Sequence, residues 1–195
     1  MFLFIGLGNP GAQYAMTRHN TGFSVIDRLS CKWNIPVDRA RCKGLAGEGR
    51  LQQERVILIK PQTYMNLSGD CVAEALHWYK AEPEQVMIFS DDIDLPVGTV
   101  RVRRFGGAGT HNGWRDILEK TGTDRFPRIR IGVGARPPEW DLKDWVLSRF
   151  SAEEQKIMDG AFANAAEAAE CFALQGIEKA MNLYNKRLTA ARDEP

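Results

Sequence analysis

The stretch FIGLGNPGAQY, residues 4–14, decides how the start of this chain folds. An apolar run leads into Gly6, Gly8 and Gly11, whose spacing satisfies the letters of the dinucleotide-binding pattern GxGxxG. That pattern binds a pyrophosphate only where a helix opens at the third glycine and an acidic residue ends a second strand about 20 residues later. Both requirements can be checked in the residues that follow.

The residues after Gly11 meet neither requirement. Residues 12–22 are polar, carry no apolar stripe and include Asn20 and Gly22, which is typical of a loop. Asp27 stands near the required distance, but its apolar neighbours recur at helical spacing, so it cannot end a strand. The sequence therefore predicts a strand, a long loop and a helix, and it favours a role other than nucleotide binding for the glycines.

Length and composition predict one globular domain covering residues 1–195. The chain has 44% apolar and 26% charged residues, which is ordinary for a folded domain. No apolar run approaches the roughly 20 residues of a membrane span, and Met1 leads into an apolar strand without a basic segment or cleavage site. We expect a cytoplasmic protein with no membrane partner. The cysteines show no zinc spacing and are expected to be reduced; they are Cys31, Cys42, Cys71 and Cys171.

Positive charge gathers in one part of the chain although the formal net charge is only +1. Residues 98–136 hold nine Lys or Arg against three acidic residues. Arg101 and Arg103 alternate with apolar residues, as do Arg128 and Arg130, so each pair projects from one side of a strand. This pattern favours a phosphate-binding patch. A solvated face without a ligand is the alternative.

Alternating strand and helix patterns predict an α/β fold. Strands are expected at residues 2–7, 43–51, 55–60, 86–90, 100–103 and 129–133. Helices are expected at residues 22–33, 68–80, 113–120, 151–175 and 177–190. A hairpin makes the sheet mixed. We expect a single domain with a mixed twisted β-sheet flanked by helices on both faces, an α/β/α sandwich.

Polar residues fall where these predicted elements begin or end. Asn9 follows the first strand, Asn66 precedes a helix, Asp91 follows the strand 86–90, and Asn112 stands at a helix start. Ligands of open α/β sheets bind in the crevice beyond the carboxyl ends of the strands. We expect these side chains to meet there, within reach of His19 from the long first loop.

His19 and Asp91 are the candidate catalytic residues. An imidazole titrates near neutrality and suits a general base acting on water, especially when a carboxylate fixes its tautomer. His77 lies on an amphipathic helix and is expected to be structural or exposed, whereas His111 is either a ligand or a positioning group. The GxSxG pattern of serine hydrolases is absent. A metal-dependent hydrolase using His19, His111 and Asp91 stays open as the alternative.

Four longer motifs carry a resemblance to a known family. They are GLGNPGAQYAMTRHNTG, KPQTYMNLSG, DDIDLPVGTVRVR and GTHNGWRDI. In order and spacing they resemble the motifs of bacterial peptidyl-tRNA hydrolases, and the resemblance covers nearly the whole chain. It implies a single-domain α/β hydrolase without metal or cofactor. Such an enzyme cleaves the ester between a peptide and the terminal ribose of tRNA, which recycles tRNA from prematurely released peptidyl-tRNA.

The resemblance also implies roles for individual residues. The glycines of the opening stretch let the backbone turn tightly while Asn9 points into the crevice, and no nucleotide cofactor is involved. His19 matches the catalytic base and Asp91 the carboxylate that orients it. The residues that match substrate-binding positions are Asn9, Tyr14, Tyr64, Asn66 and Asn112. Arg103 and Arg130 match a pair that clamps the 5′ phosphate of tRNA, and a basic set on the last helix extends this contact: Lys179, Lys186, Arg187 and Arg192. The implied partner is the acceptor stem and terminal adenosine of peptidyl-tRNA, bound by a monomer.

Some features of the sequence depart from the family pattern, and others leave a question open. Thr110 stands where a glycine commonly precedes the HNG element, and it adds a Cβ to a loop that can require a positive φ. The bulky pair Arg104 and Phe105 also precedes these glycines. Whether residues 136–148 act as a lid is open. A non-catalytic RNA-binding module is the alternative from another functional class.

Overall fold

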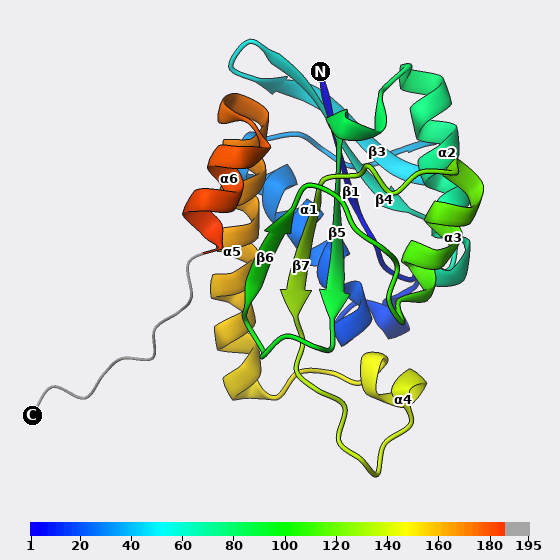
Figure 1. Cartoon of the computed structure of the whole chain (residues 1–195), viewed down its shortest axis with the longest axis vertical. Helices are drawn as coiled ribbons and strands as arrows, with labels where there is room; N and C mark the ends of the chain where they lie inside the picture. The colour runs from blue at the N-terminus through cyan, green and yellow to red at the C-terminus, as the bar shows by residue number, and fades with distance from the viewer. Residues whose placement is uncertain (186–195) are drawn as a thin grey trace, which may run out of the picture.

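The computed structural model describes residues 1–185 and contains one seven-stranded sheet (Figure 1). Its strands are β1 (Phe2–Gly6), β2 (Arg39–Arg41), β3 (Gly44–Leu51), β4 (Glu54–Pro61), β5 (Val86–Asp92), β6 (Val100–Arg103) and β7 (Arg128–Gly132). The predicted end of the last helix at residue 190 lies outside the described residues, as do Lys186, Arg187 and Arg192.

The sheet is mixed, as predicted. Its strand order is β2-β3-β4-β1-β5-β7-β6. Strands β4, β1, β5 and β7 run parallel, whereas β2, β3 and β6 pair antiparallel with their neighbours. From β1 the chain builds one half of the sheet and then returns to place β5 on the other side of β1. This change of direction leaves a crevice beyond the carboxyl ends of β1 and β5.

Helices cover both faces of the sheet, which confirms the predicted α/β sandwich. They are α1 (Thr21–Trp33), α2 (Ser68–Tyr79), α3 (Asn112–Thr121), α4 (Leu142–Val146), α5 (Ala152–Gln175) and α6 (Ile177–Tyr184). The pair α2 and α3 covers one face, and α1, α5 and α6 cover the other (Figure 1). The short helix α4 lies beyond the strand ends, where β5 and β7 point.

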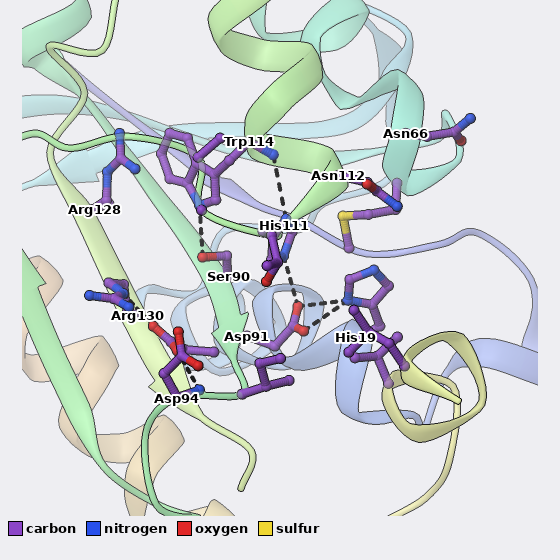
Figure 2. Close-up of a pocket in the computed structure, with 18 of the residues that line it drawn as sticks. His19, Asn66, Ser90, Asp91, Asp94, His111, Asn112, Trp114, Arg128 and Arg130 are labelled. Atoms are coloured by element: carbon purple, nitrogen blue, oxygen red, sulfur yellow. Dashed lines mark hydrogen bonds and ion pairs between the residues drawn. The ribbon is translucent and has the colours of Figure 1, made fainter. Parts of the chain in front are cut away.

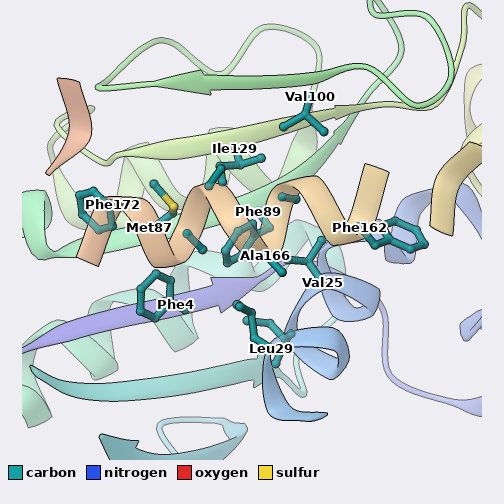
Figure 3. Close-up of a cluster of buried hydrophobic side chains, with 14 of the residues drawn as sticks. Phe4, Val25, Leu29, Met87, Phe89, Val100, Ile129, Phe162, Ala166 and Phe172 are labelled. Atoms are coloured by element: carbon teal, nitrogen blue, oxygen red, sulfur yellow. The ribbon is translucent and has the colours of Figure 1, made fainter. Parts of the chain in front are cut away.

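The larger hydrophobic core lies between the sheet and the pair α1 and α5 (Figure 3). Phe4 and Phe89 project from neighbouring parallel strands and stack with their centroids 6.4 Å apart. The buried face of α5 is built mainly from alanines, including Ala165, Ala166 and Ala169, so this helix can pack close to the aromatic rings. This packing fixes the strands whose ends carry the polar residues described below.

Close contact between two backbone segments explains Gly6, the first glycine of the opening stretch. A Cβ on Gly6 would lie 2.1 Å from the carbonyl oxygen of Gly22, and a Cβ on Gly22 would lie 2.4 Å from the amide nitrogen of Leu7. The end of β1 and the first turn of α1 therefore touch through their main chains. Of the three glycines in residues 4–14, only Gly11, at φ 112°, has the positive backbone angle that favours glycine. The expected tight turn accounts for Gly11 but not for Gly6.

Several short elements were not predicted because they have no hydrophobic period. They are the 3-10 turns η1 (Ala12–Tyr14) and η2 (Arg18–Asn20) in the first loop, the strand β2 and the helix α4. Strand β5 continues through Asp91 to Asp92, two residues beyond its predicted end, because both residues pair with β7. Thr110 does not have a positive φ; Gly109, at φ 56°, takes that conformation instead. Among residues 1–185, no helix is both long and apolar enough to cross a bilayer.

Candidate active site

A cleft of about 840 Å³ opens at the carboxyl ends of β1 and β5. It is lined by seven of the nine residues that the sequence singled out for catalysis or binding: Asn9, His19, Asn66, Asp91, Arg103, Asn112 and Arg130. The described residues that line it do not include Tyr14 or Tyr64. Tyr64 lies on the surface with 55% of its area exposed. The structure therefore brings the predicted catalytic and amide residues together and leaves both tyrosines outside.

Asp91 is the centre of the cleft. Near the end of β5, its buried carboxylate accepts hydrogen bonds from His19 Nδ1, at 2.8 and 2.9 Å, and from His111 Nε2, at 3.0 Å (Figure 2). Burial opposes ionisation of this carboxyl. The two facing imidazoles outweigh that effect and hold the pKa of Asp91 far below its ordinary value. Asp91 is therefore ionised at neutral pH and locks both rings in place.

His19 lies in the turn η2, directly before α1. The desolvation that accompanies burial disfavours its charged form. The negative charge of Asp91 and the hydrogen bond to it act in the opposite direction, and together they raise the pKa of His19 above 6.5. Because Nδ1 faces Asp91, the neutral ring carries its proton there. The lone pair of Nε2 is then available to accept a proton.

His111 caps the N-terminus of α3 and contacts Asp91 Oδ1, one of the two carboxylate oxygens that His19 contacts. Its Nδ1 accepts a long hydrogen bond, 3.4 Å, from the backbone N–H of Trp114, so Nε2 carries the proton that Asp91 accepts. The rings of His19 and His111 are 5.1 Å apart at their centroids. The sequence left His111 open between ligand and positioning group; its two hydrogen bonds favour positioning.

Asn9 presents an amide N–H₂ group to the cleft because its other polar atoms are engaged. Its backbone N–H donates to Asn20 Oδ1, and its carbonyl oxygen accepts from Asn20 Nδ2, both at 2.9 Å. Its side-chain Oδ1 accepts from the backbone N–H of Met65 at 2.8 Å. Among the described residues, Asn9 Nδ2 has no hydrogen-bond acceptor. Sequence reasoning missed Asn20, which is buried and does not line the cleft.

The other two asparagines lie at the rim. Asn112 is the first residue of α3, beside His111, and Asn66 lies in the short turn η3 (Met65–Leu67) that follows β4 (Figure 2). Both side chains are exposed. Their amides can therefore reach parts of a substrate that extend beyond the His19 end of the cleft.

The basic patch is smaller than the sequence indicated. Antiparallel pairing sets Arg101 opposite Arg130 and Arg103 opposite Arg128, so all four side chains leave one face of the sheet. Arg128 is buried with its guanidinium 3.5 Å from the Trp114 ring centroid, and burial lowers its pKa to about 10. It is a packing residue and not a surface charge. Arg130 pairs with Asp92, and exposed Arg103 forms no ion pair with another described residue.

Comparison with known proteins decides the family. The family model described as peptidyl-tRNA hydrolase matches residues 3–192. The chain belongs to the peptidyl-tRNA hydrolase family. A peptidyl-tRNA hydrolase of Lachnospira eligens is 50% identical over 185 residues, covering 95% of this chain and all of the relative, and one of Alkaliphilus metalliredigens is 48% identical with the same coverage. These matches confirm the family expected from the motifs.

Solved structures of this family share the fold. The crystal structure of peptidyl-tRNA hydrolase from Acinetobacter baumannii is 36% identical and superposes with a TM-score of 0.90, covering 95% of this chain and 94% of the other. An Arg119Gln mutant of peptidyl-tRNA hydrolase from the same organism superposes with a TM-score of 0.89 at 37% identity. The fold of this chain is therefore the fold of solved peptidyl-tRNA hydrolases.

Proposed function

We propose that this peptidyl-tRNA hydrolase cleaves the ester between a peptide and the terminal ribose of tRNA, with His19 as the general base. The observation that carries the proposal is the pair of contacts, 2.8 and 2.9 Å, between His19 Nδ1 and the carboxylate of Asp91. They direct the lone pair of Nε2 away from Asp91. A water molecule held against Nε2 can lose its proton as it attacks the ester carbonyl.

The proton then has a defined route. As the oxygen–carbon bond forms, His19 becomes an imidazolium, and the ionised Asp91 stabilises this charge without taking the proton. When the tetrahedral intermediate collapses, the ester bond breaks and the imidazolium returns the proton to the departing ribose oxygen. His111 keeps Asp91 in place throughout by its hydrogen bond to Oδ1.

The side-chain N–H₂ group of Asn9 stabilises the negative charge that develops on the ester carbonyl oxygen. Because Met65 N–H engages its Oδ1, the group that Asn9 offers to the substrate is a donor and not an acceptor. A fixed N–H donor stabilises an oxyanion without reorganising during the reaction. A positioned base contributes about 10²- to 10⁴-fold to the rate, and an ester is an activated substrate, so this small set of groups suffices.

The hydrogen bonds of the two histidines support chemistry without a metal ion, although their ligand atoms lie close together. The ligand atoms of His19, Asp91 and His111 all lie within 4.8 Å of one another, which is the arrangement that would favour a metal-dependent hydrolase. However, the proton of each imidazole lies between its nitrogen and Asp91. A cation on His111 Nε2 would also force a proton onto Nδ1, against the N–H of Trp114. Chelation with metal analysis separates the alternatives, because only the metal enzyme loses activity.

The RNA is proposed to bind along the arginine side of the cleft. Arg103 is exposed, and Arg130 lies diagonally across from it on β7, on the same face of the sheet. Both line the cleft, so the two can hold a terminal 5′ phosphate next to an acceptor stem. Proteins read such stems mainly by shape and backbone, which agrees with a chain of net charge +1. We propose that the protein works as a cytoplasmic monomer, with the terminal adenosine near the rim asparagines.

Replacement of His19 by alanine tests the proposal. His19→Ala is expected to reduce kcat on peptidyl-tRNA by about 10²- to 10⁴-fold while tRNA binding stays near wild type. His77→Ala, which changes an exposed histidine on α2, is the matched control and retains activity. Unchanged turnover by His19→Ala excludes His19 as the base. Absence of any single turnover by the wild-type protein favours the non-catalytic RNA-binding module.

A further inference from the structure

The side chain of Arg18, next to His19 in the chain, is buried and takes no part in the chemistry described above. Only 4% of Arg18 is exposed. Its Nη1 donates to the Val133 carbonyl oxygen at 2.9 Å, its Nε to Ser148 Oγ at 3.1 Å, and its Nη2 to Glu154 Oε2 at 2.8 Å. One guanidinium thus joins the end of β7, the residues after α4 and the first turn of α5.

Aromatic rings and backbone bonds complete this attachment. The guanidinium carbon lies 3.9 Å from the Trp145 ring centroid and 4.6 Å from that of Phe150. The backbone N–H of Arg18 donates to the Ser148 carbonyl oxygen at 2.9 Å, and Thr17 forms an isolated bridge with Arg149. The turn η2 is therefore fastened to residues 134–150 through both main chain and side chain.

Residues 134–150 form one wall of the cleft. The wall residues that line it are Asp141, Leu142, Lys143, Val146 and Leu147. Trp145, which stacks on Arg18, also donates from Nε1 to the Gly134 carbonyl oxygen at 3.1 Å. The same side chain thus touches both Arg18 and the start of the wall. Arg18 is the point at which the wall and the turn that carries His19 meet.

We propose that Arg18 is a positioning residue, which sets the orientation of His19 toward Asp91 and couples it to the position of the wall 134–150. The inference rests on the proposed role of His19 as the base. The turn η2 has only three residues, so a displacement at Arg18 is transmitted to the next residue. The flat guanidinium serves three acceptors while it stacks on a ring, which a lysine cannot do.

Arg18→Lys tests this inference because it keeps a positive charge near Glu154 but loses the planar fork. Misplacement of a catalytic group by about 1 Å can cost about 10²-fold, and we expect kcat to fall by about 10- to 100-fold with a smaller change in KM. In spectra of protein with ¹⁵N-labelled histidine, the Nδ1–H signal of His19, held by Asp91 in the wild type, is expected to broaden or disappear.

Ser151→Ala is the matched control. It removes the N-cap of α5 beside Glu154, which lowers stability, but Arg18 keeps its contacts. We expect its kcat within twofold of wild type and an intact His19 signal. Loss of both kcat and the His19 signal in Ser151→Ala would mean that a general loss of stability in this region is enough to cause these effects. That result would overturn the inference.

A second variant keeps the test decisive if Arg18→Lys does not fold. Ser148→Ala removes one acceptor of Arg18 and leaves the ion pair with Glu154, so kcat is expected to fall less, by about three- to tenfold. Wild-type kcat together with an unchanged His19 signal, in whichever of the two variants folds, overturns the role of Arg18. This outcome is distinct from failure of the proposed function, which would appear as unchanged turnover by His19→Ala or as a wild-type protein without any turnover.

Discussion

The core between the sheet and α5 and the cleft at the strand ends tolerate change differently. In the core, each buried side chain is one of many that share the packing, and none has a unique chemical role (Figure 3). In the cleft, a single carboxylate holds two imidazoles, and each contact is made once (Figure 2). Substitutions in the core should therefore change stability, and substitutions in the cleft should change the rate.

Asp91→Asn is expected to give the largest effect on the cleft side of this comparison. The amide keeps the shape but loses the charge that stabilises the His19 imidazolium and defines its tautomer. We expect kcat to fall by about 10²- to 10⁴-fold. Steady-state kinetics on peptidyl-tRNA measure this change. A kcat within threefold of wild type would show that Asp91 is structural.

Leu29→Ala is the corresponding change in the core. Leu29 is fully buried on α1 against the sheet, and its truncation leaves a cavity. We expect the free energy of unfolding to fall by about 2–5 kcal/mol, while kcat per folded molecule stays within twofold. Denaturant unfolding and active-site kinetics measure the two quantities. A large loss of kcat in the folded variant would contradict the separation of core from cleft.

His111 contributes both to stability and to the chemistry of the cleft, because it caps α3 and contacts Asp91. His111→Ala loses both functions, so we expect about 1 kcal/mol less stability and a kcat reduced by about tenfold. His111→Asn separates them, since asparagine is a good N-cap but is too short to replace the ring at Asp91. Its stability should recover while its kcat stays low. Recovery of both would assign His111 to helix capping alone.

Arg103→Ala should have the smallest effect, because it removes a proposed contact with tRNA and changes neither the packing of the core nor the catalytic residues. Loss of one phosphate contact is expected to weaken tRNA binding and to reduce the slope of log affinity against log salt by about 1. Binding titrations at several salt concentrations measure the slope. Arg50→Ala, on the β3–β4 hairpin, removes the same charge far from the cleft and should leave the slope unchanged. Equal slopes in the two variants would remove Arg103 from the RNA interface.

Sequence patterns predicted most of the fold because long elements carry a clear hydrophobic period. The meeting of His19 with Asp91 was also predictable, since one residue lies in a loop and the other at a strand end, and such positions converge in a parallel sheet. The contact of His111 with Asp91 was not, because it depends on how α3 docks. Arg128 was read as a surface charge because alternation along a strand does not reveal that Trp114 covers it.

The glycines and tyrosines show a second limit of prediction from sequence. Gly6 and Gly22 are required by a backbone contact between segments that no local pattern connects. Tyr14 and Tyr64 were expected to bind substrate from the family motifs, and the structure leaves them outside the cleft lining, so their binding role stays a prediction. Residue type and spacing indicate which chemistry is available, whereas packing decides which side chains reach the site.

The pH dependence of kcat/KM shows whether Asp91 makes His19 the base. His19 must be neutral to accept a proton, and its pKa is raised above 6.5, so the rate should rise with pH to a midpoint above 6.5. Asp91 stays ionised throughout this range. Asp91→Asn removes the negative charge that raises the pKa of His19, so the midpoint should move to lower pH. The same midpoint in wild type and Asp91→Asn would show that Asp91 does not make His19 the base.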